Sequence, residues 1–534
     1  MIKSIIENYL KKAIKENIEI EVFVSEGEQF GHYSTNVALK LAKIKKENPM
    51  EIAVKIASDV RHRMSDVFNK VEVAPPGFIN FWLKPEVFQN ELKEVLKKKE
   101  KYGKSQIAKR KACKIQIEFI SANPTGPLTL ANGRGGFLGD ALANILEFCG
   151  YKIEREYYVN DTGNQILTLG KSILAAGGSV PFEEKFYKGE YVKKWAKKNS
   201  AIVKKYKDNP LKVGKLAAKD FLTGIKKVLQ KEAKISFDRW TSENKHIHKR
   251  SYIKKTLNIF KKSGLVYEKD GAVWLKTTKF GDDKDRVLIT GDNFPTYFLA
   301  DSGHYLETKE RGFDGKIAIL GPDHFGYVRR IQVAAEIIGF KNSEIIITQA
   351  VRLMSQGKEV KMSKRTGEFV TFEELIKKVG VDATRFFFLM HSPDSHMDFN
   401  LDLAKERSLK NPVYYVQYAA VRCQSILKKS KIKGQKPKAK YNLLNTPEDI
   451  NLIRLLARFS EVVEEAAGKL NPQILARYSL DLARQFHNFY EKERIIGENI
   501  DKNLSLARLE LIKAVQAAFK NLFGLLGISM PKKM

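Results

Sequence analysis

The order of apolar and polar positions divides the chain into three regions. Residues 1–95 alternate helical patterns with strand-like runs, which predicts an α+β domain; the helical patterns lie at Ile5–Lys15 and Met50–Met64, and the strand-like runs at Ile18–Val24 and Asn69–Leu83. Residues 112–400 alternate strand and helix patterns, which predicts a parallel sheet with helices on its faces. Residues 401–534 have a helical pattern throughout and predict an all-α domain. The predicted fold class is therefore α/β, with two further domains.

One stretch of the central region, Glu118–Asn144, has the pattern of a phosphate site. A strand-like run at Lys114–Phe119 leads into a Pro/Gly turn at Asn123–Pro127, and apolar residues then recur at the spacing of one helix face, at Phe137, Leu138, Ala141, Leu142, Ile145 and Leu146. This order can present backbone N–H groups and a helix N-terminus to a phosphate. Three glycines are expected to let the backbone approach a ligand closely: Gly133, Gly135 and Gly136. A tight turn without a ligand remains the alternative, because the spacing fits neither the dinucleotide fingerprint nor the P-loop.

Two lysine-rich segments interrupt this organisation. Gly177–Lys234 is predicted to be a helical insertion in the central region. Lys428–Lys440 breaks the helical pattern of the last region, and both a solvated linker and an RNA-contacting loop remain open for it.

The formal net charge of +32 is the strongest signal in the composition. Such an excess attracts polyanions, which favours nucleic acid as a partner, although a lysine-biased genome would also make the surface basic. Lysine is a point charge without the rigid fork of arginine, so its excess favours contact with phosphates over reading of bases.

The composition also limits where the protein works. No run approaches the roughly 18–20 apolar residues of a membrane span, and the first residues form an amphipathic helix pattern rather than a signal peptide. Cys113, Cys149 and Cys423 form neither a disulfide framework nor a zinc pattern. We therefore expect a cytoplasmic protein without a membrane anchor or a structural metal.

The run Lys361-Met362-Ser363-Lys364-Arg365 lies between Gly357 and Gly367. Closely spaced lysines on a glycine-flanked loop suit a clamp that neutralises a polyphosphate in the transition state. A solvated run of charge is the alternative.

Two further clusters carry candidate chemistry. Tyr297 and Asp301 are four residues apart on a predicted helix, so both could line a pocket, and a carboxylate there suits a guanidinium or ammonium ligand. Gly321–Gly326 follows the apolar strand Lys316–Leu320, at the end of a parallel strand where α/β sheets bind ligands. An ordinary surface helix and, for His324, a core histidine without a ligand remain the alternatives.

These clusters lie in segments that resemble the arginyl-tRNA synthetases. Lys361–Arg365 is similar to the KMSKS-type loop of class I aminoacyl-tRNA synthetases, and the surrounding VRLMSQGKEVKMSKRTGEFVTFEEL resembles the arginyl family. The resemblance extends in order over nearly the whole chain, at Gly31–Ala38, Pro76–Asn80, Asp382–Asp402, Asn411–Tyr418 and Gly524–Met534.

The resemblance implies a fold and an activity. It implies a Rossmann-like catalytic domain over 112–400 with the insertion at 177–234, an N-terminal domain over 1–95 that contacts the tRNA elbow, and an anticodon-binding domain over 401–534. The implied activity is an arginine–tRNA ligase that uses ATP with Mg2+, L-arginine and tRNA(Arg). A monomer is expected, and the reaction forms arginyl-adenylate before the arginyl group passes to the tRNA 3′ end.

The resemblance also assigns roles to residues. Catalysis is expected from Lys361, Lys364, Thr129 and Asn132. ATP binding is expected from Gly126, Pro127, Ala131, Gly133, Asp323, His324, Met362 and Ser363. Arginine binding is expected from Glu118, Asn123, Asp161, Tyr297 and Asp301.

One departure from the family pattern affects the chemistry. The family's His-x-Gly-His signature corresponds to Thr129-Leu130-Ala131-Asn132, so neither histidine is present. Those histidines normally donate hydrogen bonds to ATP phosphates, and losing one such donor typically costs about 3–4 kcal/mol, roughly 100- to 1000-fold in rate. A smaller departure is His304-Tyr305, where the family usually has tyrosine before histidine.

Two hypotheses of different classes follow. The first is a working arginine–tRNA ligase whose other site residues compensate for the histidines. The second is a catalytically impaired, synthetase-derived RNA-binding protein. The intact Lys361–Arg365 run favours the first, and the failed fingerprint spacing makes an NAD-dependent enzyme a distant third.

Overall fold

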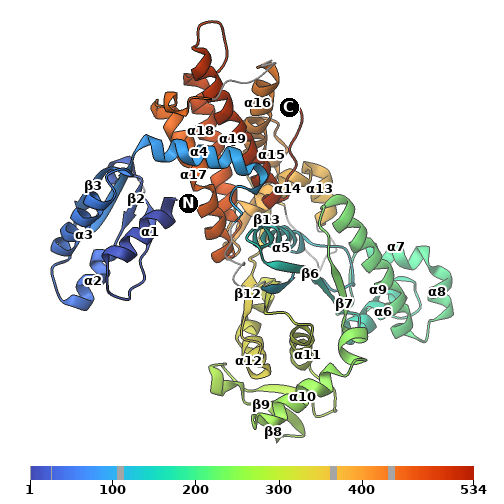
Figure 1. Cartoon of the computed structure of the whole chain (residues 1–534). Coiled ribbons are helices and arrows are strands. Elements are labelled where there is room, and N and C mark those ends of the chain that lie inside the picture. Colours follow the sequence, from blue (N-terminus) through green and yellow to red (C-terminus); the bar gives the residue numbers. More distant parts are fainter. Residues whose placement is uncertain (1, 26, 105–112, 361–369, 431–438) are drawn as a thin grey trace.

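The computed structural model describes residues 2–25, 27–104, 113–360, 370–430 and 439–534. It confirms the predicted fold class: the chain forms an α+β N-terminal part, a parallel-sheet domain and a bundle of helices, and the N-terminal part lies beside the bundle (Figure 1). None of the helices in these ranges combines the length and the apolar character needed to cross a membrane.

The N-terminal part is an antiparallel sheet covered by helices. The sheet has the order β1-β2-β4-β3, and its elements are α1 (Ile2–Ala13), β1 (Val22–Val24), β2 (Tyr33–Thr35), α2 (Val37–Lys45), α3 (Pro49–Arg63), β3 (Phe68–Ala74) and β4 (Phe78–Leu83). Asn48 caps α3, because its side chain accepts a hydrogen bond from the N–H of Met50 and proline occupies the first helical position. The single run predicted at Asn69–Leu83 is two strands joined by a turn.

Helix α4 (Pro85–Lys98) leaves this sheet and packs along α17 (Pro447–Gly468) of the C-terminal bundle (Figure 1). The two parts also meet at Glu461, whose carboxylate accepts hydrogen bonds from the Lys3 N–H at 3.0 Å and from the Tyr33 hydroxyl at 3.1 Å. The N-terminal part is therefore fastened to the helical bundle.

The central sheet has five parallel strands in the order β12-β11-β5-β6-β7. Its elements and the helices between them are β5 (Lys114–Glu118), α5 (Leu130–Phe148), β6 (Lys152–Val159), α6 (Asn164–Ala176), β7 (Arg239–Ser242), α11 (Tyr297–Glu310), β11 (Gly315–Leu320), α12 (Val328–Ile338) and β12 (Ser343–Ile347). Phe119 and Ile319 contact α5 on one face of the sheet. The carboxyl ends of the strands meet at one edge, where α/β folds bind ligands.

Smaller elements surround this sheet. One antiparallel sheet, β10-β9-β8, and helix α10 lie beside α11 and α12; these elements are α10 (Tyr252–Lys262), β8 (Val266–Lys269), β9 (Ala272–Leu275) and β10 (Arg286–Ile289). Another sheet, β14-β13-β15, comprises β13 (Val351–Ser355), β14 (Lys358–Glu359) and β15 (Met397–Asn400). Two helices separate these strands: α13 (Phe372–Val379) and α14 (Val381–Leu389).

The predicted insertion at 177–234 is helical only in part. It contains α7 (Glu190–Lys198), α8 (Ser200–Lys205), α9 (Pro210–Lys227) and a π-helical turn at Val228–Glu232, and α9 packs against α6. Gly170 and Gly214 make the packing of α6 on α9 possible, because a Cβ on either would lie 2.0 Å or less from a backbone oxygen of the other helix. The residues before α7 are not helical and approach the central sheet.

The C-terminal region consists of helices α15 (Leu401–Lys405), α16 (Pro412–Lys429), α17, α18 (Gln473–Lys492) and α19 (Lys502–Leu526). Helices α16 to α19 pack together as a bundle, and α17 and α19 also pack on α5. The buried Arg385 joins three parts of the chain, since its guanidinium contacts the Asp140 carboxylate of α5 at 2.5 Å and the carbonyl oxygens of Ala233 and Leu526. Gly527 leaves room for this guanidinium, because a Cβ there would lie 1.9 Å from the Arg385 Nη1 atom.

Candidate active site

A cavity of about 1280 Å3 opens at the carboxyl ends of β5, β6, β11 and β12. Its walls come from the turn after β5, the first turn of α5, one side of α11 and the loop after β11. The volume exceeds the roughly 300–1000 Å3 of a typical small-molecule pocket, so two small substrates fit side by side.

The cavity brings together eleven of the residues assigned from the sequence: Glu118, Asn123, Gly126, Pro127, Thr129, Ala131, Asn132, Tyr297, Asp301, Asp323 and His324. Gly133 and Asp161 do not line it. Lys361, Met362, Ser363 and Lys364 lie outside the described residues. The side chain of His324 is 47% exposed, which excludes the core histidine that the sequence left open.

The turn after β5 has an unusual backbone. Ile120 and Ser121 both have positive φ angles, 68° and 36°. This backbone conformation costs free energy in residues with a Cβ, and residues that adopt it cluster at functional sites. The Ser121 hydroxyl stabilises the turn, because it donates to the Glu118 carboxylate and accepts a hydrogen bond from the Tyr158 N–H, both at 3.0 Å. This turn fixes the position of Glu118 at the cavity floor.

Thr129 and Asn132, which replace the two histidines, hydrogen-bond to each other. Thr129 is the N-cap of α5, and the Asn132 Oδ1 atom accepts from the Thr129 N–H at 3.0 Å and from the Thr129 hydroxyl at 2.9 Å. Both residues thus form a capping box. The Thr129 hydroxyl proton is used within the cap, whereas the Asn132 amide N–H groups have no partner in the described part of the chain and remain available to a ligand.

The glycines of α5 serve different purposes from those expected. A Cβ on Gly133 would lie 2.2 Å from the Phe372 ring, and one on Gly136 would lie 2.8 Å from the Ile120 side chain. These two glycines therefore make room for neighbouring side chains. Gly135 lines the cavity, and its nearest neighbour would be Ile319 at 3.7 Å, so this glycine alone of the three leaves open space for a ligand.

Phe372 lies shortly after the sequence segment that carries Lys361 and Lys364, and it contacts the turn before α5. Its N–H donates to the carbonyl oxygen of Leu128 at 2.9 Å, one residue before the α5 cap. Arg134 of α5 holds nearby segments, because its buried guanidinium donates to the carbonyl oxygens of Gln349, Ser392 and Ser395 at 2.7–2.8 Å. Phe372, which follows the segment that carries Lys361 and Lys364, is therefore anchored beside the N-terminus of α5.

Asp161 lies just beyond the cavity wall. Its carboxylate accepts hydrogen bonds from the Ser242 hydroxyl at 2.6 Å and the Asn244 N–H at 3.0 Å, so it holds the segment that follows β7. Its neighbour Asn160 lines the cavity.

Asp301 and Tyr297 occupy the α11 side of the cavity, as the four-residue spacing predicts. The half-buried Asp301 accepts a short hydrogen bond from the Tyr327 hydroxyl. Burial, together with the nearby Glu118 and Glu243, raises the pKa of Asp301 to about 6, although the hydrogen bond from Tyr327 opposes this shift. A cation entering the cavity would favour the ionised carboxylate.

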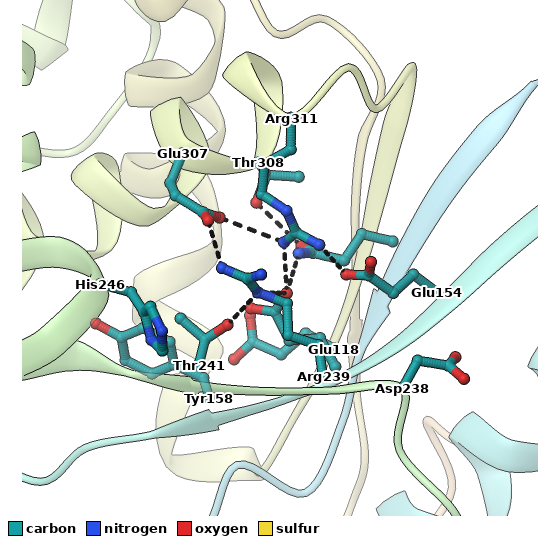
Figure 2. A network of polar contacts seen from close by, with 12 residues as sticks. Glu118, Glu154, Tyr158, Asp238, Arg239, Thr241, His246, Glu307, Thr308 and Arg311 are labelled. Atoms are coloured by element: carbon teal, nitrogen blue, oxygen red, sulfur yellow. Dashed lines mark hydrogen bonds and ion pairs between the residues drawn. The ribbon is translucent and has the colours of Figure 1, made fainter. Parts of the chain in front are cut away.

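A buried polar network lies between the sheet and α11 (Figure 2). Arg311 binds Glu154 and Glu156 of β6, and Glu307 bridges Arg311 and Arg239 of β7. His304 lines the cavity with Nε2 2.6 Å from a Glu156 oxygen, and its ring stacks on Tyr158. The pKa of Glu156 lies far below its usual value, because His304, Lys316 and Arg311 outweigh the opposing effect of burial. The sequence analysis did not identify this network.

The insertion supplies a cavity wall that the sequence analysis also missed: Glu184, Lys185, Phe186, Tyr187, Lys188 and Tyr191. The Tyr191 ring packs on Gly126, where an added Cβ would lie 2.9 Å from the ring. Aromatic residues flanking Gly189, which has a φ of 139°, are the signal that distinguishes this segment from the charged helices around it.

No group of three or more histidine, cysteine, aspartate or glutamate residues that could hold a metal ion occurs in the described ranges. The polar residues that line the cavity carry amides, hydroxyls, carboxylates, imidazoles and ammonium groups, so hydrogen-bond donors and acceptors are both present for substrates with phosphate, carboxylate and cationic groups.

Models of three protein domains match the chain in order: an arginyl-tRNA synthetase N-terminal domain over residues 1–83, a class I (R) tRNA synthetase catalytic domain over 91–386 and a DALR anticodon-binding domain over 416–534. An arginine–tRNA ligase of Listeria welshimeri is 41% identical over 531 residues, which cover 97% of this chain and 94% of the relative. This similarity to ligases does not favour the impaired RNA-binding alternative.

Solved structures share the fold. The arginyl-tRNA synthetase of Thermus thermophilus superposes with a TM-score of 0.78 at 21% identity, covering 100% of both chains. A methionyl-tRNA synthetase of Mycobacterium tuberculosis in complex with methionyl-adenylate gives 0.54 at 12% identity, covering 78% of this chain and 92% of that one. With these matches, the chain belongs to the arginyl-tRNA synthetases, class I ligases that join arginine to tRNA.

Proposed function

We propose that the cavity holds ATP at the α5 end and L-arginine at the α11 end, and that this arrangement forms arginyl-adenylate. The observation that carries the proposal is a single cavity with a helix N-terminus and amide donors on one side and Asp301 with Glu118 on the other. The first side favours phosphates, and the second favours a guanidinium.

The ATP side would use the turn after β5 and the start of α5. Gly135 leaves open space there, and Gly126, Pro127 and Ala131 line the same wall. Asp323 and His324 face the cavity from the loop after β11. Lys361 and Lys364 would neutralise the phosphates. The hydrogen bond from the Phe372 N–H to the Leu128 carbonyl supports this role, because it holds a residue close to them in sequence beside the N-terminus of α5.

The arginine side would use Asp301 and Glu118 for the guanidinium, with Asn123 and Tyr297 nearer the reacting carboxylate. Asp161 would act indirectly, by holding the segment after β7 beside Asn160. Gly133 would likewise act through Phe372 rather than by touching ATP.

The chemistry requires no protein nucleophile. An oxygen of the arginine carboxylate attacks the α-phosphorus of ATP, pyrophosphate leaves, and a hydroxyl of the terminal tRNA ribose then attacks the carbonyl carbon and releases AMP. Mg2+ enters as part of the ATP substrate. The protein contributes positioning and charge stabilisation.

We further propose that tRNA(Arg) spans the molecule. Residues 1–95 would contact its elbow and residues 401–534 its anticodon, with the catalytic domain over 112–400 between them. The net charge of +32 supports a polyanionic partner. The protein would act as a monomer in cytoplasmic translation.

The decisive measurement is ATP–pyrophosphate exchange that depends on both arginine and tRNA(Arg). Exchange well above background supports the proposal, and exchange at background with intact tRNA would overturn it.

Asp301→Asn should raise the KM for arginine about 30-fold or more while changing the KM for ATP less than about threefold, because only the guanidinium loses a charged partner. Equal effects on both substrates would refute the assignment of Asp301.

A further inference from the structure

The layer between the central sheet and α11 is polar, although it is buried. Glu118 pairs with Ala318 on one neighbouring strand and with Glu156 on the other, while Lys316 pairs with Gln116. Side chains of paired residues in parallel strands point to the same face, and so do residues two apart in a strand. Glu118, Glu156, Gln116 and Lys316 therefore all point toward α11, on the face opposite the one that Phe119 and Ile319 present to α5.

Lys316 lies at the centre of this layer and is 1% exposed. Its ammonium is 2.8 Å from a Glu118 oxygen and 3.2 Å from His304 Nδ1, and it lies over the Tyr305 ring. Glu118 and His304 line the cavity but Lys316 does not. Lys316 thus contacts Glu118 from the side of that residue that faces away from the cavity, and the two side chains are paired without a substrate.

Asp301 presents the opposite case. Its described partner is the neutral Tyr327 hydroxyl, and no lysine or arginine of the described ranges forms an ion pair with it. Two carboxylates therefore face the substrate from this end of the cavity. Glu118 is paired with the ammonium of Lys316, whereas Asp301 is not paired with a lysine or arginine of the described ranges. A buried charge without a counter-ion is destabilised, so the ionised carboxylate of Asp301 is stabilised more than that of Glu118 when a cation enters the cavity.

We propose that Lys316 is an internal counter-ion that cancels the charge of Glu118, so that Asp301 selects the positive charge of the substrate side chain. Glu118 then contributes an oriented acceptor held by Lys316, Ser121 and His304. Lys316 is a positioning residue, because it touches Glu118 and not the cavity. This inference rests on the proposed placement of arginine beside α11.

The test compares the binding of arginine and of citrulline, its neutral analogue, by titration calorimetry of the full chain. The variants are Asp301→Asn, Glu118→Gln, Lys316→Met and the double variant Glu118→Gln/Lys316→Met. Asp301→Asn should weaken arginine about 30-fold or more and leave citrulline within about threefold, which removes the discrimination between them. Glu118→Gln alone should weaken arginine about 30-fold, because Lys316 is left unpaired beneath the incoming guanidinium.

The double variant is decisive. Replacing both members of a buried ion pair by neutral groups is far milder than removing one, so it should bind arginine within about fivefold of the wild type. Lys316→Met alone should bind arginine no more weakly than the wild type. If Glu118 were itself the charge that selects arginine, the double variant would stay as weak as Glu118→Gln, and that result would overturn the inference.

Two controls keep the outcomes separate. Lys309→Met removes an exposed lysine of α11 whose ammonium contacts only the Ile338 carbonyl in the described part of the chain, and it should change neither ligand's affinity. Thermal unfolding of each variant identifies any that fails to fold. Absence of arginine binding to the folded wild type would overturn the placement of arginine itself, whereas binding without rescue in the double variant overturns only the role of Lys316.

Discussion

At the scale of single residues, the first turn of α5 explains how the chain accommodates the loss of two histidines. Thr129 and Asn132 satisfy each other and the helix N-terminus, so the replaced positions stabilise the helix even in an empty site. The family resemblance assigned catalytic roles to both residues. The Thr129 hydroxyl donates to the Asn132 oxygen within the cap, so the amide of Asn132 is the donor that the cap leaves free.

Asn132→His should therefore accelerate arginine-dependent ATP–pyrophosphate exchange by about tenfold or more, because a donor able to carry charge would face the phosphates. The variant should lose about 1 kcal/mol of stability, since the Asn132 oxygen no longer completes the cap. Asn132→Ala is the matched control that loses the cap without gaining a donor, and it should slow exchange. An unchanged rate in Asn132→His would mean that position 132 does not reach the phosphates.

Asp301 gives the site a pH dependence whose sign is fixed. Its pKa of about 6 in the empty site lies above the usual value, and the guanidinium needs the ionised form. Arginine affinity should be complete above that pKa and fall as the pH drops through it, by about tenfold between pH 7 and pH 5. Calorimetric titration across this range measures the effect. Asp301→Asn should bind weakly with no such slope, and a flat wild-type profile would contradict the prediction.

The buried network marks the limit of residue-level prediction. Alternating polar residues at Lys114, Gln116 and Glu118 were visible in a strand-like run, and Lys316 begins an otherwise apolar strand. What could not be read from one sequence is the strand order that places Lys316 diagonally across from Glu118. Pairing between segments 200 residues apart is a property of the fold, not of local pattern.

At the scale of elements, α5 was predicted correctly as a helix after a strand and a turn, but the purposes of its glycines were not. Helical spacing reveals which residues share a face, whereas the neighbours of that face come from distant segments. Phe372 fills the space at Gly133, and it lies more than 200 residues further along the chain.

Substitution of these glycines separates packing from ligand binding. Gly133→Ala should cost about 1–3 kcal/mol of stability, because its methyl group would collide with the Phe372 ring. Gly135→Ala should keep or raise stability by up to about 1 kcal/mol, because alanine favours the helix, while the KM for ATP rises. Thermal unfolding and exchange kinetics measure both. Equal loss of stability in the two variants would refute the distinction.

The helices of the insertion were predictable from the sequence, but the contact of the insertion with the cavity was not. Its helices follow from apolar spacing, but the non-helical residues before α7 were not predicted to reach the cavity. Tyr191 packs on Gly126 because α7 and α9 both pack against α6 and so place the insertion beside the central sheet. The lysine-rich composition of the insertion predicts a charged surface, whereas its contact with Gly126 is made by the aromatic ring of Tyr191.

At the scale of the whole molecule, the alternation of strands and helices was enough to predict the fold class and the parallel sheet. The connections between the three parts were not predictable from pattern. Glu461 contacts Lys3 and Tyr33 across more than 400 residues of sequence. Arg385 likewise joins α5, the end of the insertion and the last turn of α19.

Arg385→Met should destabilise the protein by about 3–5 kcal/mol, because it leaves the Asp140 carboxylate buried without its closest cation. Urea unfolding followed by far-UV circular dichroism measures this loss. Arg352→Met removes an exposed arginine paired with Asp398 at 2.7 Å, and this control should cost about 1 kcal/mol or less. Similar losses in both variants would show that Arg385 does not stabilise the junction of the three parts.

The same arginine has a consequence for communication over distance. The Leu526 carbonyl at the end of α19, the Arg385 guanidinium and the Asp140 carboxylate form a chain of contacts to α5, the helix on which the nucleotide chemistry would occur. A nucleic acid that displaced the end of α19 would therefore also disturb the contact between Arg385 and the Leu526 carbonyl.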